Sequence, residues 1–202
     1  MARVPVIDER TNPGKMVLNV ESVGLTPEQF DRLCRDNRDL RLELTARKEL
    51  LIMAPTHTRT GFMNTKITSA LGAWTDADGA GIAGDSNTGF TLPNGAIRAP
   101  DASWTRREKW DALTEDQRNS FVPICPDFVI ELRSQSETVQ ELQNKMAEYI
   151  ANGAQMGWLI DPFDRKVYIY QPGHPPERLD DPTCVRADAV VPGFTLDLIR
   201  IW

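Results

Sequence analysis

The amino-terminal part of the chain shows two hydrophobic patterns that predict a helix followed by a β-hairpin. Residues 30–34 repeat apolar positions at the i, i+3, i+4 spacing of a half-buried helix, with Thr26 as its N-cap and an end near Asn37. Residues 40–44 then alternate strictly, and a second apolar run over 49–53 follows a short polar connection. Two such runs around a short connection are typical of a hairpin.

The rest of the chain alternates between helical and extended patterns, punctuated by glycine, proline and asparagine. Asn94-Gly95 predicts a tight turn between two short extended segments. The further expected elements are helices over about 58–75 and 137–152, strands over 100–104, 128–132, 158–160 and 167–170, and a final extended segment over 191–202. This order predicts an α/β fold with a mixed, partly parallel sheet flanked by helices.

Composition divides the chain into two unequal parts. Residues 1–24 are rich in turn formers, and we expect them to form a flexible N-terminal arm. Residues 25–202 are long enough for one domain with its own core, since 41% of the 202 residues are hydrophobic.

Net charge and apolar content narrow the class of protein. The net charge of −6 argues against broad electrostatic adhesion to nucleic acid, because Lys and Arg supply most non-specific affinity for phosphate. It leaves a nucleic-acid enzyme open, since a divalent cation held by acidic residues reverses the sign that a phosphate meets. No stretch has the length of a signal-peptide core or a membrane span, and the three cysteines are too scattered for a metal or redox pair. We expect a cytoplasmic protein with no membrane partner and with reduced, mostly buried thiols.

The strongest chemical signal is Glu131, which lies inside the apolar run Phe128-Val129-Ile130-Glu131-Leu132. Such a run fills the middle of a sheet, where an ionised carboxylate has no ordinary place. A buried charge without a partner is so unfavourable that the group is usually protonated, paired with a cation or bound to a metal.

Asp101, which follows Pro100, and a basic residue after Glu131 complete a set of two acids and a base. Arg133 lies two positions after Glu131 and shares its strand face, while Lys145 lies beside the stripe of the next helix that faces the sheet. Carboxylates on adjacent strands suit hard cations such as Mg²⁺ or Mn²⁺, which bind oxygen ligands. If the two strands are neighbours, the metal would activate a water for attack on a phosphodiester, and an ammonium group would stabilise the transition state.

The segment around Glu131 also resembles a known family. Residues 126–136 read Pro-Asp-Phe-Val-Ile-Glu-Leu-Arg-Ser-Gln-Ser, and further matching positions are Glu43, Met53-Ala54-Pro55, His57, Pro100-Asp101, Lys145, Tyr149, Gly153, Trp158-Leu159-Ile160-Asp161-Pro162 and Val191-Pro192-Gly193-Phe194. As a set, these positions resemble the Uma-two family of endonucleases, which belongs to the restriction endonuclease-like PD-(D/E)XK superfamily. The resemblance covers most of residues 25–202.

This resemblance implies a restriction endonuclease-like fold with a metal-dependent nuclease site. Asp101 and Glu131 would be ligands of the metal, and the carbonyl of Leu132 would be a third. Glu43 would lie on the helical side of the site.

The chain departs from the family pattern at the lysine position. That lysine would fall at residue 133, where this chain has Arg133, and arginine stays protonated and cannot serve as a general base. Lys145 matches a helix lysine common in the family and is the expected replacement. Arg133 would then be a phosphate or carboxylate partner.

The two acids also have structural interpretations. Asp101 suits a turn or cap after a proline. Glu131 suits a purely structural ion pair with Arg133 or Lys145, because such pairs also bury carboxylates.

Lys145 and Glu43 have similar alternatives. Lys145 lies four residues after Glu141, the spacing of a surface salt bridge on a helix. Glu43 suits the solvent side of a hairpin if its sheet has one open face.

The leading hypothesis is an endonuclease that hydrolyses DNA with a carboxylate-bound Mg²⁺ or Mn²⁺ and an activated water. The alternative is a catalytically degenerate protein of nuclease fold that acts as a binding or interaction module, and a weaker third hypothesis is a hydrolase of smaller phosphate esters. The apolar end Ile199-Arg200-Ile201-Trp202 suits a homodimer surface, and a homodimer is among the expected partners. The candidate catalytic residues are Asp101, Glu131, Lys145, Arg133 and Glu43.

Overall fold

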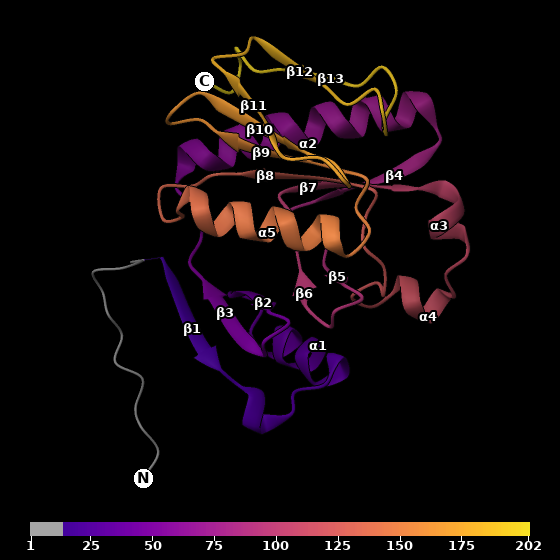
Figure 1. Ribbon diagram of the computed structural model, residues 1–202. Coiled ribbons are helices and arrows are strands. Elements are labelled where there is room, and N and C mark those ends of the chain that lie inside the picture. The colour runs from indigo at the N-terminus through magenta and orange to yellow at the C-terminus, as the bar shows by residue number, and fades with distance from the viewer. Residues whose placement is uncertain (1–13) are drawn as a thin grey trace.

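The computed structural model describes residues 14–202, which form two main sheets with helices on both sides of the larger one (Figure 1). The helices are α1 Pro27–Asp36, α2 Thr58–Asp78, α3 Arg107–Asp111, α4 Glu115–Arg118 and α5 Val139–Ala151, with a 3₁₀ turn at Glu21–Val23. The strands are β1 Lys15–Asn19, β2 Arg41–Leu44, β3 Glu49–Met53, β4 Gly81–Asp85, β5 Phe90–Thr91, β6 Ile97–Arg98, β7 Ala102–Arg106, β8 Phe128–Leu132, β9 Met156–Asp161, β10 Lys166–Tyr170, β11 Glu177–Asp180, β12 Cys184–Arg186 and β13 Thr195–Asp197.

The large sheet has the strand order β11-β10-β9-β8-β7-β4. Its central pair, β8 and β9, is parallel, and the neighbouring pairs are antiparallel. A parallel pair needs a crossover connection, and α5 supplies it between these two strands. Thr138 caps this helix in a capping box with Glu141, which fixes where the crossover begins.

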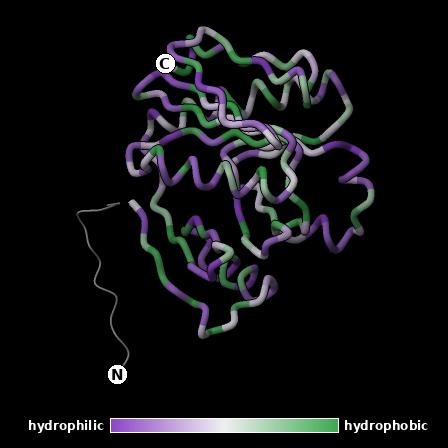
Figure 2. Tube along the Cα trace, in the orientation of Figure 1, coloured by the Kyte–Doolittle hydropathy of each residue, from purple (hydrophilic) through white to green (hydrophobic). Residues whose placement is uncertain are grey.

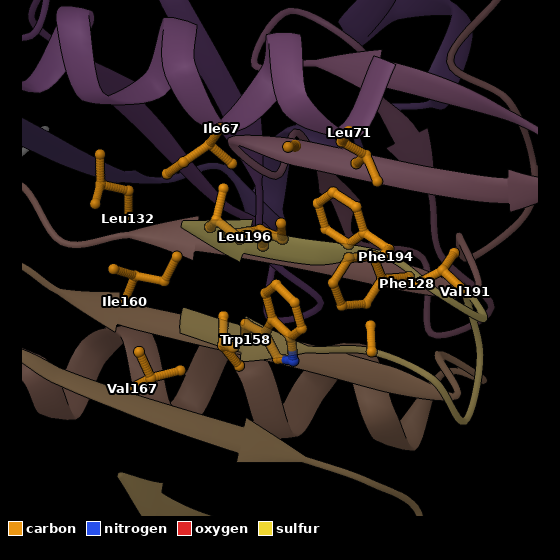
Figure 3. Packing of buried hydrophobic residues seen from close by; sticks show 14 of the residues in the cluster. Ile67, Leu71, Phe128, Leu132, Trp158, Ile160, Val167, Val191, Phe194 and Leu196 are labelled. Carbon is orange, nitrogen blue, oxygen red and sulfur yellow. The ribbon is translucent and has the colours of Figure 1, made fainter. Parts of the chain in front are cut away.

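Strand β8 separates two different layers, because successive side chains of a strand point to opposite faces. Phe128, Ile130 and Leu132 join a cluster with α2 and the carboxy-terminal segment, in which Trp158 stacks on Phe194 at 5.8 Å between ring centroids (Figure 3). The opposite face, which contains Val129, packs against α5. Figure 2 shows hydrophobic stretches along these central strands and hydrophilic stretches in the segment of α3 and α4.

The small sheet has the order β1-β3-β2-β6-β5 and lies on the α5 side of the large sheet (Figure 1). Phe30 of α1 is fully buried with Leu44, Leu50 and Ile97 of this sheet. The helix begins at the capping box of Thr26 and Gln29. Helix α5 thus lies between the two sheets.

The α/β fold class, the hairpin β2-β3, the turn at Asn94-Gly95 and the parallel central pair are confirmed. The division into an arm and a domain at residue 24 stays a prediction, and residues 1–13 lie outside the described part. Residues 15–19 nevertheless differ from the loose chain expected there, because Met16, Val17 and Leu18 extend a ladder along β3.

Two further expectations need correction. The segment 191–202 is only briefly extended, at β13, which pairs with the unanticipated strand β12. The three cysteines are free, but Cys184 is exposed and Cys34 is only partly buried. The prediction that the thiols are mostly buried was therefore wrong. Within residues 14–202, none of the helices combines the length and hydrophobicity of a membrane-spanning segment.

Candidate active site

Asp101 and Glu131 lie at the same end of two neighbouring strands. Ala102 of β7 pairs with Ile130 of β8, so the residues that flank this pair come close together. Oδ2 of Asp101 accepts a hydrogen bond of 2.9 Å from the backbone N–H of Leu132. Both carboxylates line one small cavity of about 20 Å³, as does Leu132.

Glu131 is buried, with 2% of its surface exposed. The hydroxyl of Tyr149 donates to its Oε1 at 3.1 Å, and Nζ of Lys145 lies 2.8 Å from the same oxygen. Burial raises the pKa of Glu131 to about 8: Lys145 opposes this shift, whereas the negative charges of Asp101 and Glu43 add to it. The charged form of Glu131 is therefore disfavoured, and a further cation nearby would stabilise it.

Lys145 is the centre of a buried ion-pair network. Its Nζ donates to Glu43 at 3.0 Å and lies 2.8 Å from Glu131. Burial alone would lower the pKa of Lys145, but Glu131 and Glu43 outweigh burial and raise it, so the side chain stays an ammonium. Its position follows from the α5 stripe, in which Leu142, Met146 and Tyr149 are buried.

The alternative interpretation of Lys145 as a surface partner of Glu141 is wrong. Glu141 caps its own helix through Thr138 and pairs with Lys15 instead. Lys145 lies three residues after Leu142 and four before Tyr149, beside the buried stripe, and its ammonium reaches Glu131 and Glu43.

Glu43 comes from the small sheet and is 2% exposed, so its interpretation as a solvent-side hairpin residue is wrong. Helix α5 covers that face of β2, and Glu43 accepts hydrogen bonds from Lys145, from Arg98 at 3.1 Å and from the backbone N–H of Ala99 at 3.3 Å. Burial would raise the pKa of Glu43, but Lys145, Arg98 and Arg41 outweigh it and lower the pKa to about 2. Glu43 is therefore a fixed anion that holds Lys145.

Asp101 has two further partners that the sequence did not single out. Nδ2 of Asn64 donates to its Oδ1 at 3.2 Å, and Nη1 of Arg41 lies 3.6 Å from that oxygen. Arg41 also donates to the carbonyl of Ala99 at 3.0 Å. Asp101 thus does more than cap a turn, because its carboxylate ties β7, β8, β2 and α2 together.

Arg133 belongs to a separate arrangement. Its Nη1 donates to Asp161 at 2.9 Å, its Nε donates to the carbonyl of Glu137, and its guanidinium lies 5.1 Å from the ring centroid of Phe163. The expected role as a carboxylate partner is met by Asp161, which is fully buried. The lining of the small cavity includes Lys145 but not Arg133.

Four contributors were missed or undervalued at the sequence level: Arg41, Asn64, Arg98 and Tyr149. Tyr149 belongs to the apolar stripe of the helix, so the sequence predicts only a core residue, but its hydroxyl donates to Glu131. Arg98 follows an apolar strand residue and gives no pattern of its own. Only the pairing of distant strands brings such residues together.

The donor set at the cavity suits a hard cation. Within residues 14–202, no three His, Cys, Asp or Glu side chains are grouped as a metal site. The set consists instead of the carboxylates of Asp101 and Glu131 with neutral oxygens, which is how Mg²⁺ is commonly held. The amide Oδ1 of Asn64 is buried with no hydrogen-bond partner in the described chain, and a cation would satisfy it.

A wider pocket of about 510 Å³ opens beside this site, between the small sheet and α5. Glu43, Arg98 and Lys145 line it on the inner side, and Lys15 and Arg47 lie farther out. Lys145 lines both this pocket and the small cavity, so it connects the open surface with the buried acids.

Comparisons with known proteins agree with this arrangement. Residues 27–198 match the family model described as "Uma2: Putative restriction endonuclease". A solved structure with a TM-score of 0.67 is described as a putative nuclease belonging to DUF820 from Anabaena variabilis, with 21% sequence identity over 79% of this chain and 88% of that one. No curated protein gives a match. The structural match establishes a fold shared with that protein, the restriction endonuclease-like fold.

Proposed function

The chain belongs to the Uma2 family, whose model is described as "Putative restriction endonuclease", and we propose that it is a Mg²⁺- or Mn²⁺-dependent endonuclease that hydrolyses phosphodiester bonds in DNA. The observation that carries the proposal is the convergence of Asp101, Glu131 and Lys145, from three different segments of the chain, on one cavity. Burying three ionisable groups together at one sheet end is unfavourable for folding, which makes such a cluster a candidate functional site.

Asp101 and Glu131 hold the cation in this proposal, with the carbonyl of Leu132 as a further oxygen ligand. When bound, the metal lowers the pKa of a coordinated water and shields the charge that develops on the phosphate. Oδ2 of Asp101 accepts a hydrogen bond from the N–H of Leu132, and Oδ1 accepts one from Nδ2 of Asn64. Both carboxylate oxygens are therefore held in place, and their remaining lone pairs would serve the metal. Tyr149 and Lys145 both contact Oε1 of Glu131, which leaves Oε2 for the metal.

Lys145 takes the role of the family lysine in this proposal, as a charge rather than as a base. Its raised pKa keeps it protonated at neutral pH, so it cannot take a proton from water. A positioned ammonium stabilises negative charge in the transition state. Glu43 holds Lys145 in place from the small sheet.

A cleavage assay on supercoiled plasmid tests the proposal. We expect nicking with Mg²⁺ or Mn²⁺ and none with EDTA, and we expect Asp101→Ala and Glu131→Ala to abolish it. Asp161→Asn is the matched control, because Asp161 is a buried carboxylate on the next strand that pairs with Arg133 outside the cavity. Metal-supported nicking that persists in both alanine variants would show that the site is wrong.

The alternative function is a binding or interaction module on the same fold. Arg133 at the family lysine position favours it. The ion pair of Lys145 with Glu131 also favours it, because that carboxylate already has a cationic partner. Titration calorimetry separates the two. An intact fold that binds no Mn²⁺ at millimolar concentration would favour the module.

A further inference from the structure

The side chain of Asn64 has one satisfied end and one unsatisfied end. Asn64 lies in the second turn of α2, and its Nδ2 donates to Asp101 at 3.2 Å. Its Oδ1 is buried and has no hydrogen-bond partner in residues 14–202. Rotation of the amide would not help, because the oxygen would then face the Asp101 carboxylate, which is also an acceptor.

The side chain that carries this unsatisfied oxygen lines the same cavity as the two acids. The cavity of about 20 Å³ contains the side chains of Asn64, Asp101 and Glu131 in its wall. That volume admits about one water molecule or one ion. Native proteins rarely bury an acceptor without a partner, so an unpaired one indicates a missing water or cation.

A second unpaired atom at the cavity limits the choice of ligand. Nε of Arg41 is also buried without a partner in the described chain, and Arg41 lines the same cavity. An unpaired acceptor and an unpaired donor on two side chains that line one cavity match a cation together with an anionic oxygen, such as a phosphate oxygen bound to a metal. A single water would also satisfy both atoms, and the experiment below distinguishes these cases.

We propose that Asn64 is a ligand of the metal centre, with its Oδ1 as a neutral oxygen donor beside Asp101 and Glu131. Amide oxygens are ordinary ligands of hard cations. A neutral ligand adds coordination without adding a third negative charge next to Glu131, whose charged form is already disfavoured. This inference rests on the proposed metal-dependent function and adds a residue to the same site.

Mn²⁺ titration calorimetry on the full chain tests the ligand role with two variants of similar size. Asn64→Leu removes the oxygen, and we expect its affinity for Mn²⁺ to fall by at least about 10-fold. Asn64→Asp keeps an oxygen at the same place but loses the N–H that donates to Asp101. If Oδ1 is a ligand, Asn64→Asp binds Mn²⁺ at least as tightly as the wild type; if Asn64 only orients Asp101, both variants bind more weakly.

A charge control and a stability measurement complete the test. Thr65→Asp adds a carboxylate at the next, exposed position of α2. We expect it to change the affinity for Mn²⁺ by less than about twofold. Melting with and without Mn²⁺ should show a larger metal-induced rise in Tm for Asn64→Asp than for the wild type, because two carboxylates repel in the metal-free state.

Several outcomes overturn the proposal. If Asn64→Leu bound Mn²⁺ as tightly as the wild type, the unpaired oxygen of Asn64 would be a partner of a bound water and not a metal ligand. The proposed function would still stand if Asp101→Ala abolished Mn²⁺ binding. Equal gains in affinity for Thr65→Asp and Asn64→Asp would reduce the effect to charge alone. If the wild type bound no Mn²⁺, both this inference and the proposed metal-dependent function would be wrong.

Discussion

The two faces of the large sheet use the same strand for different purposes. On one face of β8, Phe128 packs edge-on against Trp158 at 4.8 Å between ring centroids, inside an apolar layer. On the other face, Glu131 contacts Tyr149 and Lys145, and the layer includes buried charges. Because side chains alternate along a strand, one segment contributes both to the core and to the candidate site. Stability and chemistry should therefore respond to mutations face by face.

The largest expected effect comes from the charged face. Glu131→Gln keeps the size of the side chain but removes a metal-binding charge, and we expect cleavage to slow by at least about 1,000-fold, which corresponds to about 4 kcal/mol on the barrier. Unfolding in urea at pH 8 should give an unchanged or higher free energy, because a disfavoured charge has been removed. Parallel losses of activity and stability would contradict the separation of the two faces.

The apolar face should give the opposite result. Phe194 is 1% exposed and stacks with Trp158, so Phe194→Ala should lower the free energy of unfolding by about 3–5 kcal/mol. Cleavage per folded molecule, measured at low temperature, should stay unchanged. Phe62→Ala is the control, since Phe62 is 67% exposed and its loss should change stability by less than about 0.5 kcal/mol.

The pH dependence of stability tests Glu131 directly. Its pKa in the folded protein is about 8, above the ordinary value of 4.5, so folding binds a proton between these two values. The stabilisation from this group is complete below pH 4.5 and is lost as the pH rises toward 8.

Wild type should therefore lose stability relative to Glu131→Gln across this range, on the order of a few kcal/mol. Glu43 should act in the opposite sense: its pKa of about 2 means that its contribution is present at neutral pH and is lost only in acid. Urea unfolding at several pH values measures both effects. A pH-independent difference between wild type and Glu131→Gln would contradict the raised pKa.

The smallest expected effect concerns Arg133, which pairs with Asp161 and does not line the small cavity. Arg133→Lys restores the family residue but breaks the contacts with Asp161 and the carbonyl of Glu137. We expect a loss of about 1 kcal/mol in stability and less than about a threefold change in cleavage. A large gain in cleavage would show that residue 133, rather than Lys145, holds the lysine role.

Patterns within short segments were sufficient for most of the fold. The capped helices, the β2-β3 hairpin and the parallel pair around α5 all follow from local periodicity and caps. Short strands such as β11 and β12 were not predicted, because they gain their pairing from partners far along the chain and have weak alternation of their own.

From local pattern alone, the site is visible where a residue contradicts its surroundings. Glu131 is such a residue, since a carboxylate in an apolar strand is visible in the sequence. Asp101, Lys145 and Glu43 were singled out largely through the family resemblance. Asn64 and Arg41 agree with their helix and strand, and only the three-dimensional structure brings them to Asp101. The burial of Glu43 likewise depends on α5 covering β2, which no hairpin pattern reveals.

The contribution of Glu43 from the small sheet has a practical consequence for heat inactivation. All five tryptophans, Trp74, Trp104, Trp110, Trp158 and Trp202, lie outside the small sheet. Trp110 packs against a cluster that includes Phe90 of β5, whereas the other four tryptophans lie outside that cluster. Partial melting of the small sheet would therefore release the anchor of Lys145 while most indole rings keep their surroundings. Inactivation would then precede most of the change in intrinsic fluorescence, and an optical melting curve would overstate the temperature at which the protein still works.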